Sequence, residues 1–370
     1  MELRHLRPRV LVTLGLVAIT LLSGCNDSLL PPPPRTPPRP PTQSATWDLV
    51  GLQGETKLIS VAVVRARPWE ILVGTMNTYS SETPGKILRS QDWGKTWTVV
   101  LDSVSVSQIV VEQNEGNRVY ATLNMGNHPT PVIARSLDAG RTWEWVDFGI
   151  DLDGLARVGP LRIDPVHTNV VYAGTIGRYG GGFYKSTDMG TSWRLTPPDR
   201  PGENSVLRGG VSAIAIDPKN PNELYVAEMS PGSVYKSYDG GATFQVLDIP
   251  VLDVPDGIEV DPYHSNIVYL GMRSGGLFRS SDHGASWGSS LAANAWASKI
   301  VSRSDSLLFA SSGWNAEGGM FGSTDAGVTW SLLSPGPRFV HDIAIDTTNN
   351  FVYSLEVQGA ESGLYRYKIR

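Results

Sequence analysis

The chain has 370 residues, of which 31 are basic and 36 acidic, so its formal charge is −5. This length allows a sizeable hydrophobic core, and because 41% of the residues are hydrophobic and 18% charged, a wholly disordered chain is excluded. The acidic balance excludes a general nucleic-acid binder, which needs a basic surface, and the single cysteine excludes a disulfide framework.

The first 24 residues are predicted to be an export signal. Three arginines precede an apolar stretch at 10–22, which at about 1.5 Å per residue is too short to span a hydrocarbon core. The stretch ends in Leu-Ser-Gly-Cys, which resembles a bacterial lipobox. That resemblance implies that the signal is removed and that Cys25 is lipidated, so that the protein is anchored on the periplasmic or outer-surface side of a bacterial cell envelope. The alternative is an ordinary signal followed by an unmodified thiol.

Residues 25–45 carry the lipidated cysteine and are predicted to be a linker. Eight of the eleven residues at 31–41 are proline, and proline fixes φ and removes the amide donor. A polyproline II segment is therefore expected, reaching up to about 3.1 Å per residue. We interpret it as a spacer; the alternative is a ligand for an SH3-type domain.

From residue 46 the chain repeats one unit. A Ser-x-Asp-x-Gly-x-Thr/Ser-aromatic motif occurs six times at intervals of 43 to 51 residues. The motif predicts a hairpin turn, because the Asp side chain accepts backbone N–H bonds and Gly adopts positive φ. Its aspartates are Asp92, Asp138, Asp188, Asp239, Asp282 and Asp325.

This motif resembles the Asp-box, or BNR (sialidase-type) repeat, of β-propellers. The resemblance implies that the six aspartates are structural and lie on the perimeter. A second fingerprint precedes each motif: apolar-Asp-Pro, then Asn, then an apolar-Tyr pair, as at Asp164, Asn169 and Tyr172. Each unit then holds four short strands, which is one propeller blade.

The units predict an all-β, seven-bladed β-propeller over residues 46–370. The last unit runs from Asp342 through 363–367, with three strands and no Asp-box motif. Residues 46–51 resemble the strand that follows the first motif, around Trp97. We therefore expect this N-terminal strand to pair with the last one and close the ring, which removes an exposed edge.

Ligands of propellers favour the face built from loops that join the second strand to the third and from loops that enter the innermost strand. Arginine and exposed aromatic residues, the usual anchors of recognition sites, occur in these loops. An arginine-rich face on an acidic protein suits an anionic patch on a partner; the alternative is a set of scattered, solvated side chains. The candidate partner-binding residues are Arg157, Arg178, Tyr179, Arg208, Arg273, Trp296, Trp314 and Arg338.

A glycosidase is one alternative, because the repeat is named for sialidases. The Arg-Ile-Pro segment of those enzymes is absent, and Asp-box xyloglucanases use two propellers. The catalytic residues of sialidases could be matched here by Arg178, Arg208, Arg273, Tyr179 and Glu228. Any propeller that contains several arginines would allow such a match. No pair of catalytic carboxylates is evident, so catalysis is not predicted, and neither is a cofactor or metal site.

Residues 46–370 are similar to the single propellers of the photosystem II assembly factor family. That resemblance implies a non-catalytic scaffold or assembly subunit that binds a membrane protein complex, photosynthetic in that family, through an arginine-rich face. The remaining alternative is carbohydrate or peptide recognition, as in sortilin-like or lectin propellers, with Trp296 and Trp314 as stacking platforms.

Overall fold

A computed structural model describes the fold of the repeated region. It covers residues 48–55, 57–77, 84–124, 132–150, 157–176, 181–196, 210–291, 297–303, 306–311, 319–333, 339–357 and 361–369. The predicted signal, Cys25 and the proline-rich linker lie outside these residues. Within them, no helix is long and apolar enough to cross a membrane.

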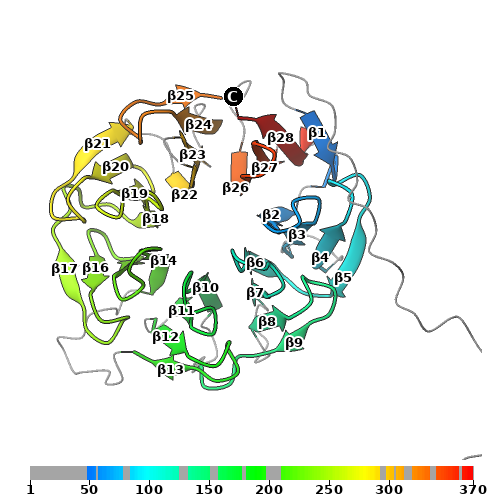
Figure 1. The fold of residues 1–370 in the computed structure, drawn as a ribbon, viewed down its shortest axis with the longest axis horizontal. Helices are drawn as coiled ribbons and strands as arrows, with labels where there is room; N and C mark the ends of the chain where they lie inside the picture. Colours follow the sequence, from blue (N-terminus) through cyan, green and yellow to red (C-terminus); the bar gives the residue numbers. More distant parts are fainter. Residues whose placement is uncertain are drawn as a thin grey trace, which may run out of the picture. The chain divides into compact units, whose positions relative to one another are not determined.

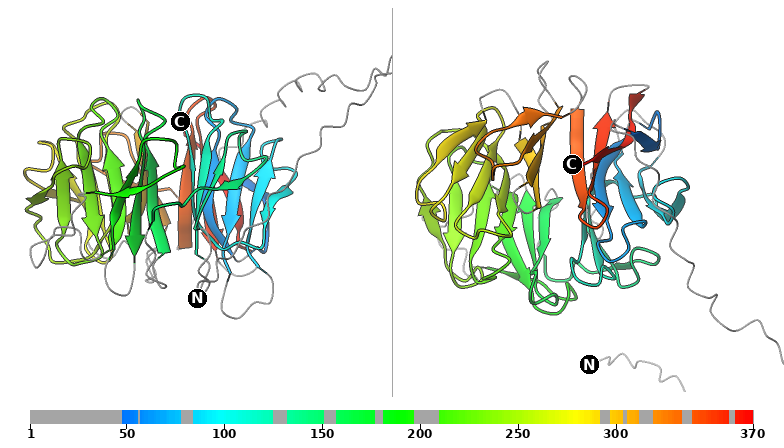
Figure 2. Two further views of the ribbon diagram at one scale, coloured as in Figure 1. Left: turned by 90° about the horizontal axis from the view of Figure 1, so that it is seen from below. Right: turned by 45° about the horizontal axis from the view of Figure 1, so that its top comes forward.

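The strands form an all-β propeller, which confirms the fold class expected from the repeats. They pair into seven four-stranded antiparallel sheets set around a central axis (Figure 1). Seen from the side, the strands run across the thickness of the ring, and loops cover its two faces (Figure 2). In the sheet of β22 to β25, few side chains of the two inner strands are described.

Each sheet is named below by its innermost strand. From the centre outward, the sheets are β2 (Leu58–Val63), β3 (Ile71–Thr75), β4 (Lys86–Ser90) and β5 (Thr98–Asp102); β6 (Val106–Val111), β7 (Val119–Leu123), β8 (Ile133–Ser136) and β9 (Glu144–Trp145); β10 (Arg157–Ile163), β11 (Val171–Ile176), β12 (Phe183–Ser186) and β13 (Arg194–Leu195); β14 (Val211–Ile216), β15 (Leu224–Glu228), β16 (Val234–Ser237) and β17 (Gln245–Leu247); β18 (Pro255–Val260), β19 (Val268–Met272), β20 (Gly276–Ser280) and β21 (Gly288–Leu291); β22 (Ala297–Arg303), β23 (Ser306–Ser311), β24 (Gly319–Ser323) and β25 (Ser331–Leu332); and β26 (Phe339–Asp346), β27 (Phe351–Val357), β28 (Gly363–Lys368) and β1 (Asp48–Gly51).

The N-terminal strand completes the last sheet. β1 pairs antiparallel with β28, so that Asp48 lies opposite Arg366 and Leu49 opposite Tyr365. The Arg366 guanidinium donates to the Asp48 carboxylate at 3.0 Å. The β26 sheet is thus made from both ends of the propeller, as the resemblance of residues 46–51 to a post-turn strand predicted.

The hydrophobic core lies between neighbouring sheets. The second strand of most sheets is buried along its whole length, because both of its faces pack against an adjacent sheet, as in β3, β7 and β19. The outermost strands β9 and β25 are exposed. This gradient explains why the second strands are mostly apolar, with a buried Tyr in β7, β11, β15, β19 and β27.

The six Ser-x-Asp-x-Gly turns share one hydrogen-bond pattern. In the turn of the β10 sheet, the Asp188 carboxylate accepts bonds from the Ser192 N–H and hydroxyl at 2.9 and 2.7 Å. The Ser186 hydroxyl donates to Asp188 at 2.7 Å and accepts from the Gly190 N–H at 2.8 Å. These bonds, from Ser192 first and then Ser186, lower the pKa of Asp188 to about 2. The aspartates therefore stabilise the turns, as predicted.

A repeated contact at the perimeter joins neighbouring sheets. Tyr120 of β7 donates to the Met189 carbonyl in the next sheet's turn at 2.8 Å, and its cross-strand partner Arg135 donates to the same oxygen at 2.6 Å. Burial raises the pKa of Tyr120 to about 12, so the hydroxyl stays protonated. We call this contact the perimeter latch. Its other members are Tyr172 and Lys185 on Gly240, Tyr225 and Lys236 on His283, Tyr269 and Arg279 on Ala326, and Arg89 alone on Ala139.

Candidate binding channel

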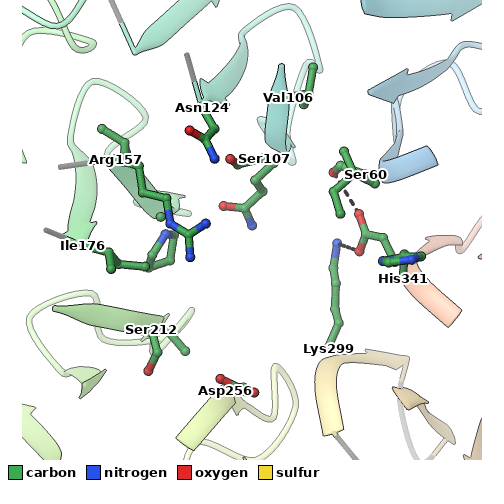
Figure 3. Close-up of a pocket in the computed structure, with 18 of the residues that line it drawn as sticks. Ser60, Val106, Ser107, Asn124, Arg157, Ile176, Ser212, Asp256, Lys299 and His341 are labelled. Carbon is green, nitrogen blue, oxygen red and sulfur yellow. Dashed lines mark hydrogen bonds and ion pairs between the residues drawn. The ribbon is translucent and has the colours of Figure 1, made fainter. Parts of the chain in front are cut away.

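A cavity of about 720 Å³ lies at the centre of the ring and is lined by all seven innermost strands. Its size is that of a site for a small ligand or a short peptide segment. In Figure 3, Arg157 and Lys299 reach into it from different sides, and Ser107, Ser212, Asp256 and His341 stand around it. We call this cavity the channel.

A β-bulge recurs near the start of every innermost strand and shapes the channel. At each bulge the register with the second strand slips, and the extra residue is turned away from the regular ladder. In β18, for example, Pro255 pairs with Met272 and Gly257 with Gly271, which leaves Asp256 unpaired between them. The bulge residues are Ile59, Ser107, Gly159 with Pro160, Ser212, Asp256, Ser298 and His341.

One carboxylate of the channel holds several sheets together. Asp342 of β26 accepts bonds from the Ser60 hydroxyl at 2.9 Å and the Val61 N–H at 2.8 Å, both in β2. Lys299 of β22 lies 2.6 Å from its other oxygen. The Ser60 hydroxyl in turn accepts from the Ile109 N–H of β6 at 3.0 Å. Asp342 and Ser60 therefore link four consecutive sheets, and we call them the channel clamp.

A second channel carboxylate is also paired. Asp256, at the bulge of β18, binds the Arg273 guanidinium in two places, at 2.9 and 3.1 Å. These bonds raise the pKa of Arg273 above its ordinary value. Both residues belong to one sheet and lie at the end of the channel where the innermost strands begin, because Asp256 is the second residue of β18 and Arg273 directly follows β19. We call this end of the channel the mouth.

Three other charged side chains of the channel, Arg157, Arg162 and Glu259, form no ion pair among the described residues. Arg157 is exposed and Glu259 half-buried, and neither side chain has a hydrogen bond or ion pair among the described residues. Within the part of the chain that the structure describes, Arg162 donates only to the Leu161 carbonyl of its own strand, at 3.0 Å. Burial raises the pKa of Glu259 to about 7, although the charges of Arg162 and Lys299 oppose the rise.

The rest of the lining combines aliphatic residues, such as Ile59, Ile176 and Ile258, with uncharged polar ones. Ser105, Gln108 and Asn124 offer hydroxyl and amide groups, and Gln108 accepts from the Leu161 N–H at 2.9 Å. His341 is exposed to solvent, and desolvation by the surrounding channel wall lowers its pKa against the charge of Asp342. Of the lining residues that are described, none is Trp, Tyr or Phe, so this part of the channel offers no platform for stacking a sugar.

The predicted site residues meet different outcomes. Arg157 lines the channel, whereas Arg273 is engaged with Asp256. Arg178, Tyr179, Arg208, Trp296, Trp314 and Arg338 lie outside the described residues. Glu228 is buried and accepts a bond from the Tyr235 hydroxyl at 3.2 Å, away from the channel lining. Within the described ranges, no cluster of three His, Cys, Asp or Glu has the arrangement of a metal site.

Sequence reasoning missed Arg162, Glu259, Lys299 and Asp342. The signal was a charged residue inside a strand placed innermost by the repeat, as in Leu-Arg-Ile at 161–163 and Ile-Glu-Val at 258–260. Because innermost strands face the axis, such a residue points either into the core or into the channel.

Comparison with curated proteins finds glycoside hydrolases. The chain is 27% identical over 222 residues to a xyloglucanase of Hypocrea jecorina, covering 56% of this chain and 23% of that protein. It is 28% identical over 204 residues to a xyloglucanase of a Paenibacillus species, covering 42% and 20%. The chain thus spans about a quarter or less of the length of these relatives. No family model matches it.

Comparison with solved structures finds propellers of two kinds. YCF48 from Cyanidioschyzon merolae superposes with a TM-score of 0.61 at 15% identity, covering 88% of this chain and 99% of that one. A structure of YCF48 bound to D1 peptide gives 0.60 at 14%, covering 90% and 99%. The GH74 xyloglucanase from Xanthomonas campestris gives 0.50 at 17%, covering 86% and 57%. At these identities the likeness shows the propeller fold.

Proposed function

We propose that the protein is a lipid-anchored, extracytoplasmic, seven-bladed propeller that binds a segment of a membrane protein complex at the mouth of its channel and catalyses no reaction. This proposal rests on how the charged side chains at the mouth are paired. Its carboxylate, Asp256, is held by Arg273, whereas the Arg157 guanidinium is exposed without a partner among the described residues. A mouth of this kind suits an anionic segment of a partner protein.

Two further points support a protein ligand. The described lining has no aromatic platform, which a glycan site would use. Two structures of similar fold are YCF48, one of them bound to D1 peptide, and that chain is spanned almost completely by this one. We propose by analogy that the partner here is also a membrane protein, whether photosynthetic or not.

The test is purification of the protein from its own membranes in mild detergent, with mass spectrometry of the proteins that co-migrate. We expect a stoichiometric complex that is lost in Arg157→Glu. The matched control is Arg194→Glu, because Arg194 is exposed on β13, the outermost strand of the same sheet. Isolation of the protein alone, or equal loss in both variants, would contradict the proposal.

The anchor is tested separately. Cys25→Ala is expected to move the protein from the membrane fraction to the soluble fraction of the cell envelope, because only a lipidated cysteine at the signal cleavage site would hold it there. Unchanged membrane association of this variant, in the absence of the partner complex, would rule out the anchor.

A glycoside hydrolase is the second candidate, because the curated relatives are xyloglucanases and Glu259 has the raised pKa of a general acid. Against it, the nearby Asp342 is engaged by Ser60, Val61 and Lys299 and is not free to act as nucleophile or base. Release of reducing sugar from xyloglucan by the wild-type protein, abolished in Glu259→Gln, would favour the hydrolase over the scaffold.

A further inference from the structure

Arg162 and Glu259 lie deeper in the channel than the mouth. Arg162 is near the end of β10 and Glu259 near the end of β18, five and three positions beyond Arg157 and Asp256 respectively. At about 3.3 Å per residue, Arg162 is up to about 16 Å further along its strand than Arg157. Both side chains line the cavity, so a ligand group that reaches them occupies a place separate from the mouth.

The deep part of the channel is positively charged whenever Glu259 is protonated. Lys299 is paired with Asp342, and Asp256 with Arg273, which leaves Arg157 at the mouth and Arg162 with Glu259 deeper in the channel. The Arg162 guanidinium then has no carboxylate to balance it. An incoming anion is favoured by this balance and an incoming cation is opposed by it.

The charged groups that act on Glu259 come from its own strand and from two other innermost strands. Arg162 acts on it from β10 and Lys299 from β22, while Asp261 follows it on its own strand. β14, the neighbouring innermost strand, offers only Ser212 and Ala213 to the cavity. The other ionisable groups of the same cavity are Arg157, Asp256, His341 and Asp342.

A carboxyl group in this state can act as a hydrogen-bond donor. Burial raises the pKa of Glu259 to about 7, so that near neutral pH about half of the molecules carry the proton. A neutral carboxylic acid donates one O–H bond, and a guanidinium donates two parallel N–H bonds to a carboxylate. Together they match the two oxygens of a single carboxylate.

We propose that Arg162 and Glu259 form a second, deeper subsite that binds a carboxylate group and, in molecules where Glu259 is ionised, takes up a proton from solvent at Glu259 when it does so. The Arg162 guanidinium binds the carboxylate through its N–H groups. The protonated Glu259 carboxyl donates its O–H to one carboxylate oxygen, which removes the repulsion between two anions. This subsite is independent of the identity of the partner at the mouth.

The test uses the propeller labelled with ¹³C at its glutamate carboxyl carbons, with acetate as the probe because it is small enough to enter the channel. The Glu259 resonance, assigned by its loss in Glu259→Gln, is followed by NMR against pH. We expect a midpoint of about 7 in chloride. In saturating acetate we expect it to rise by about one pH unit, which corresponds to tenfold tighter binding of acetate by the protonated form.

Two matched substitutions on one strand locate the effect. Arg162→Gln is expected to abolish the response of the Glu259 midpoint to acetate, and Arg157→Gln to retain it. If Arg162→Gln does not fold, Arg162→Lys decides, because it keeps the charge but loses the planar fork and should weaken the response. A midpoint near 4.5 in chloride, a midpoint that acetate does not move, or loss of the response in Arg157→Gln alone would overturn the subsite. None of these results depends on capture of a membrane partner.

Discussion

The sheets are joined differently on the two sides of the ring. From the β2 sheet round to the β22 sheet, each junction uses the perimeter latch, in which basic or tyrosine side chains donate to a carbonyl of the next turn. At the β26 sheet the latch is absent among the described residues. Tyr353 stands at the latch position, but its hydroxyl is buried without a hydrogen-bond partner, and Arg366 turns to Asp48 of its own sheet.

The channel clamp takes the place of the latch at this closing sheet. Asp342 binds the β22 sheet through Lys299 and the β2 sheet through Ser60 and Val61. The repeated turn therefore has two roles, since it closes its own hairpin and accepts hydrogen bonds from the neighbouring sheet. Where the repeat stops, the ring is held by buried polar contacts at its centre and by the β1 strand at its edge.

The largest expected effect comes from removing the edge strand. Deletion of residues 46–51 removes β1, with ladder bonds contributing about 1 kcal/mol each and the partly buried Val50 contributing about 1.5 kcal/mol. We expect a loss of unfolding free energy on the order of 5 kcal/mol, because an edge of β28 is also left open. Thermal unfolding measures it.

The matched control is deletion of residues 26–45, which leaves β1 intact and should leave the unfolding temperature almost unchanged. Equal unfolding temperatures of the two deletion variants would show that β1 does not hold the ring closed.

A smaller effect is expected at the clamp. Asp342→Ala removes the partner of Lys299, Ser60 and the Val61 N–H at once. Asp342 is buried and Lys299 partly exposed, so we expect a loss of about 3 kcal/mol, the lower end of the cost of breaking a buried ion pair. Asp256→Ala is the matched change in the other paired carboxylate. It joins no sheets, and its partner Arg273 is partly exposed, so about 1 kcal/mol or less is expected. Equal losses in chemical denaturation would remove the distinction between a clamp and an ordinary ion pair.

The sequence predicts the repeated parts of the structure and does not predict the bulges that interrupt the repeat. The propeller, the turns and the closing strand were predictable, because each repeats or completes a pattern of known period. The bulges were not, because one extra residue in a short strand leaves the apolar pattern nearly unchanged. Arg273 was therefore expected to meet a partner protein, whereas the bulge at Asp256 supplies its ligand within the chain.

Replacing the third channel carboxyl, Glu259, should raise the unfolding free energy rather than lower it, because Glu259 joins no sheets. Its pKa is about 7 in the folded protein, above the ordinary 4.5, so the folded state holds a proton that the unfolded state has lost between these values. Stability therefore falls as pH rises through this window. Glu259→Gln stays neutral and should be more stable than wild type above pH 7, by up to about 3 kcal/mol and less where water screens the site.

The measurement is urea unfolding of wild type and Glu259→Gln at several pH values. The two curves of unfolding free energy against pH should meet near the lower end of the window and diverge as pH rises. Parallel curves would show that Glu259 does not titrate near neutral pH, and would also remove the basis of the deep subsite.

The smallest expected effect on stability distinguishes a latch tyrosine that donates a hydrogen bond from one that does not. Tyr269→Phe removes a hydroxyl that donates to the Ala326 carbonyl at 2.9 Å, and should cost about 1 kcal/mol because the carbonyl loses one of its two donors. Tyr353→Phe removes the same group from the same place in the closing sheet, where the hydroxyl is buried without a partner. That change should be neutral or slightly stabilising, because burying an unsatisfied hydroxyl is itself unfavourable. Both variants are compared with wild type by urea unfolding. If Tyr353→Phe costs as much as Tyr269→Phe, the closing sheet is latched like the others, and the clamp at Asp342 is an addition to the latch rather than its substitute.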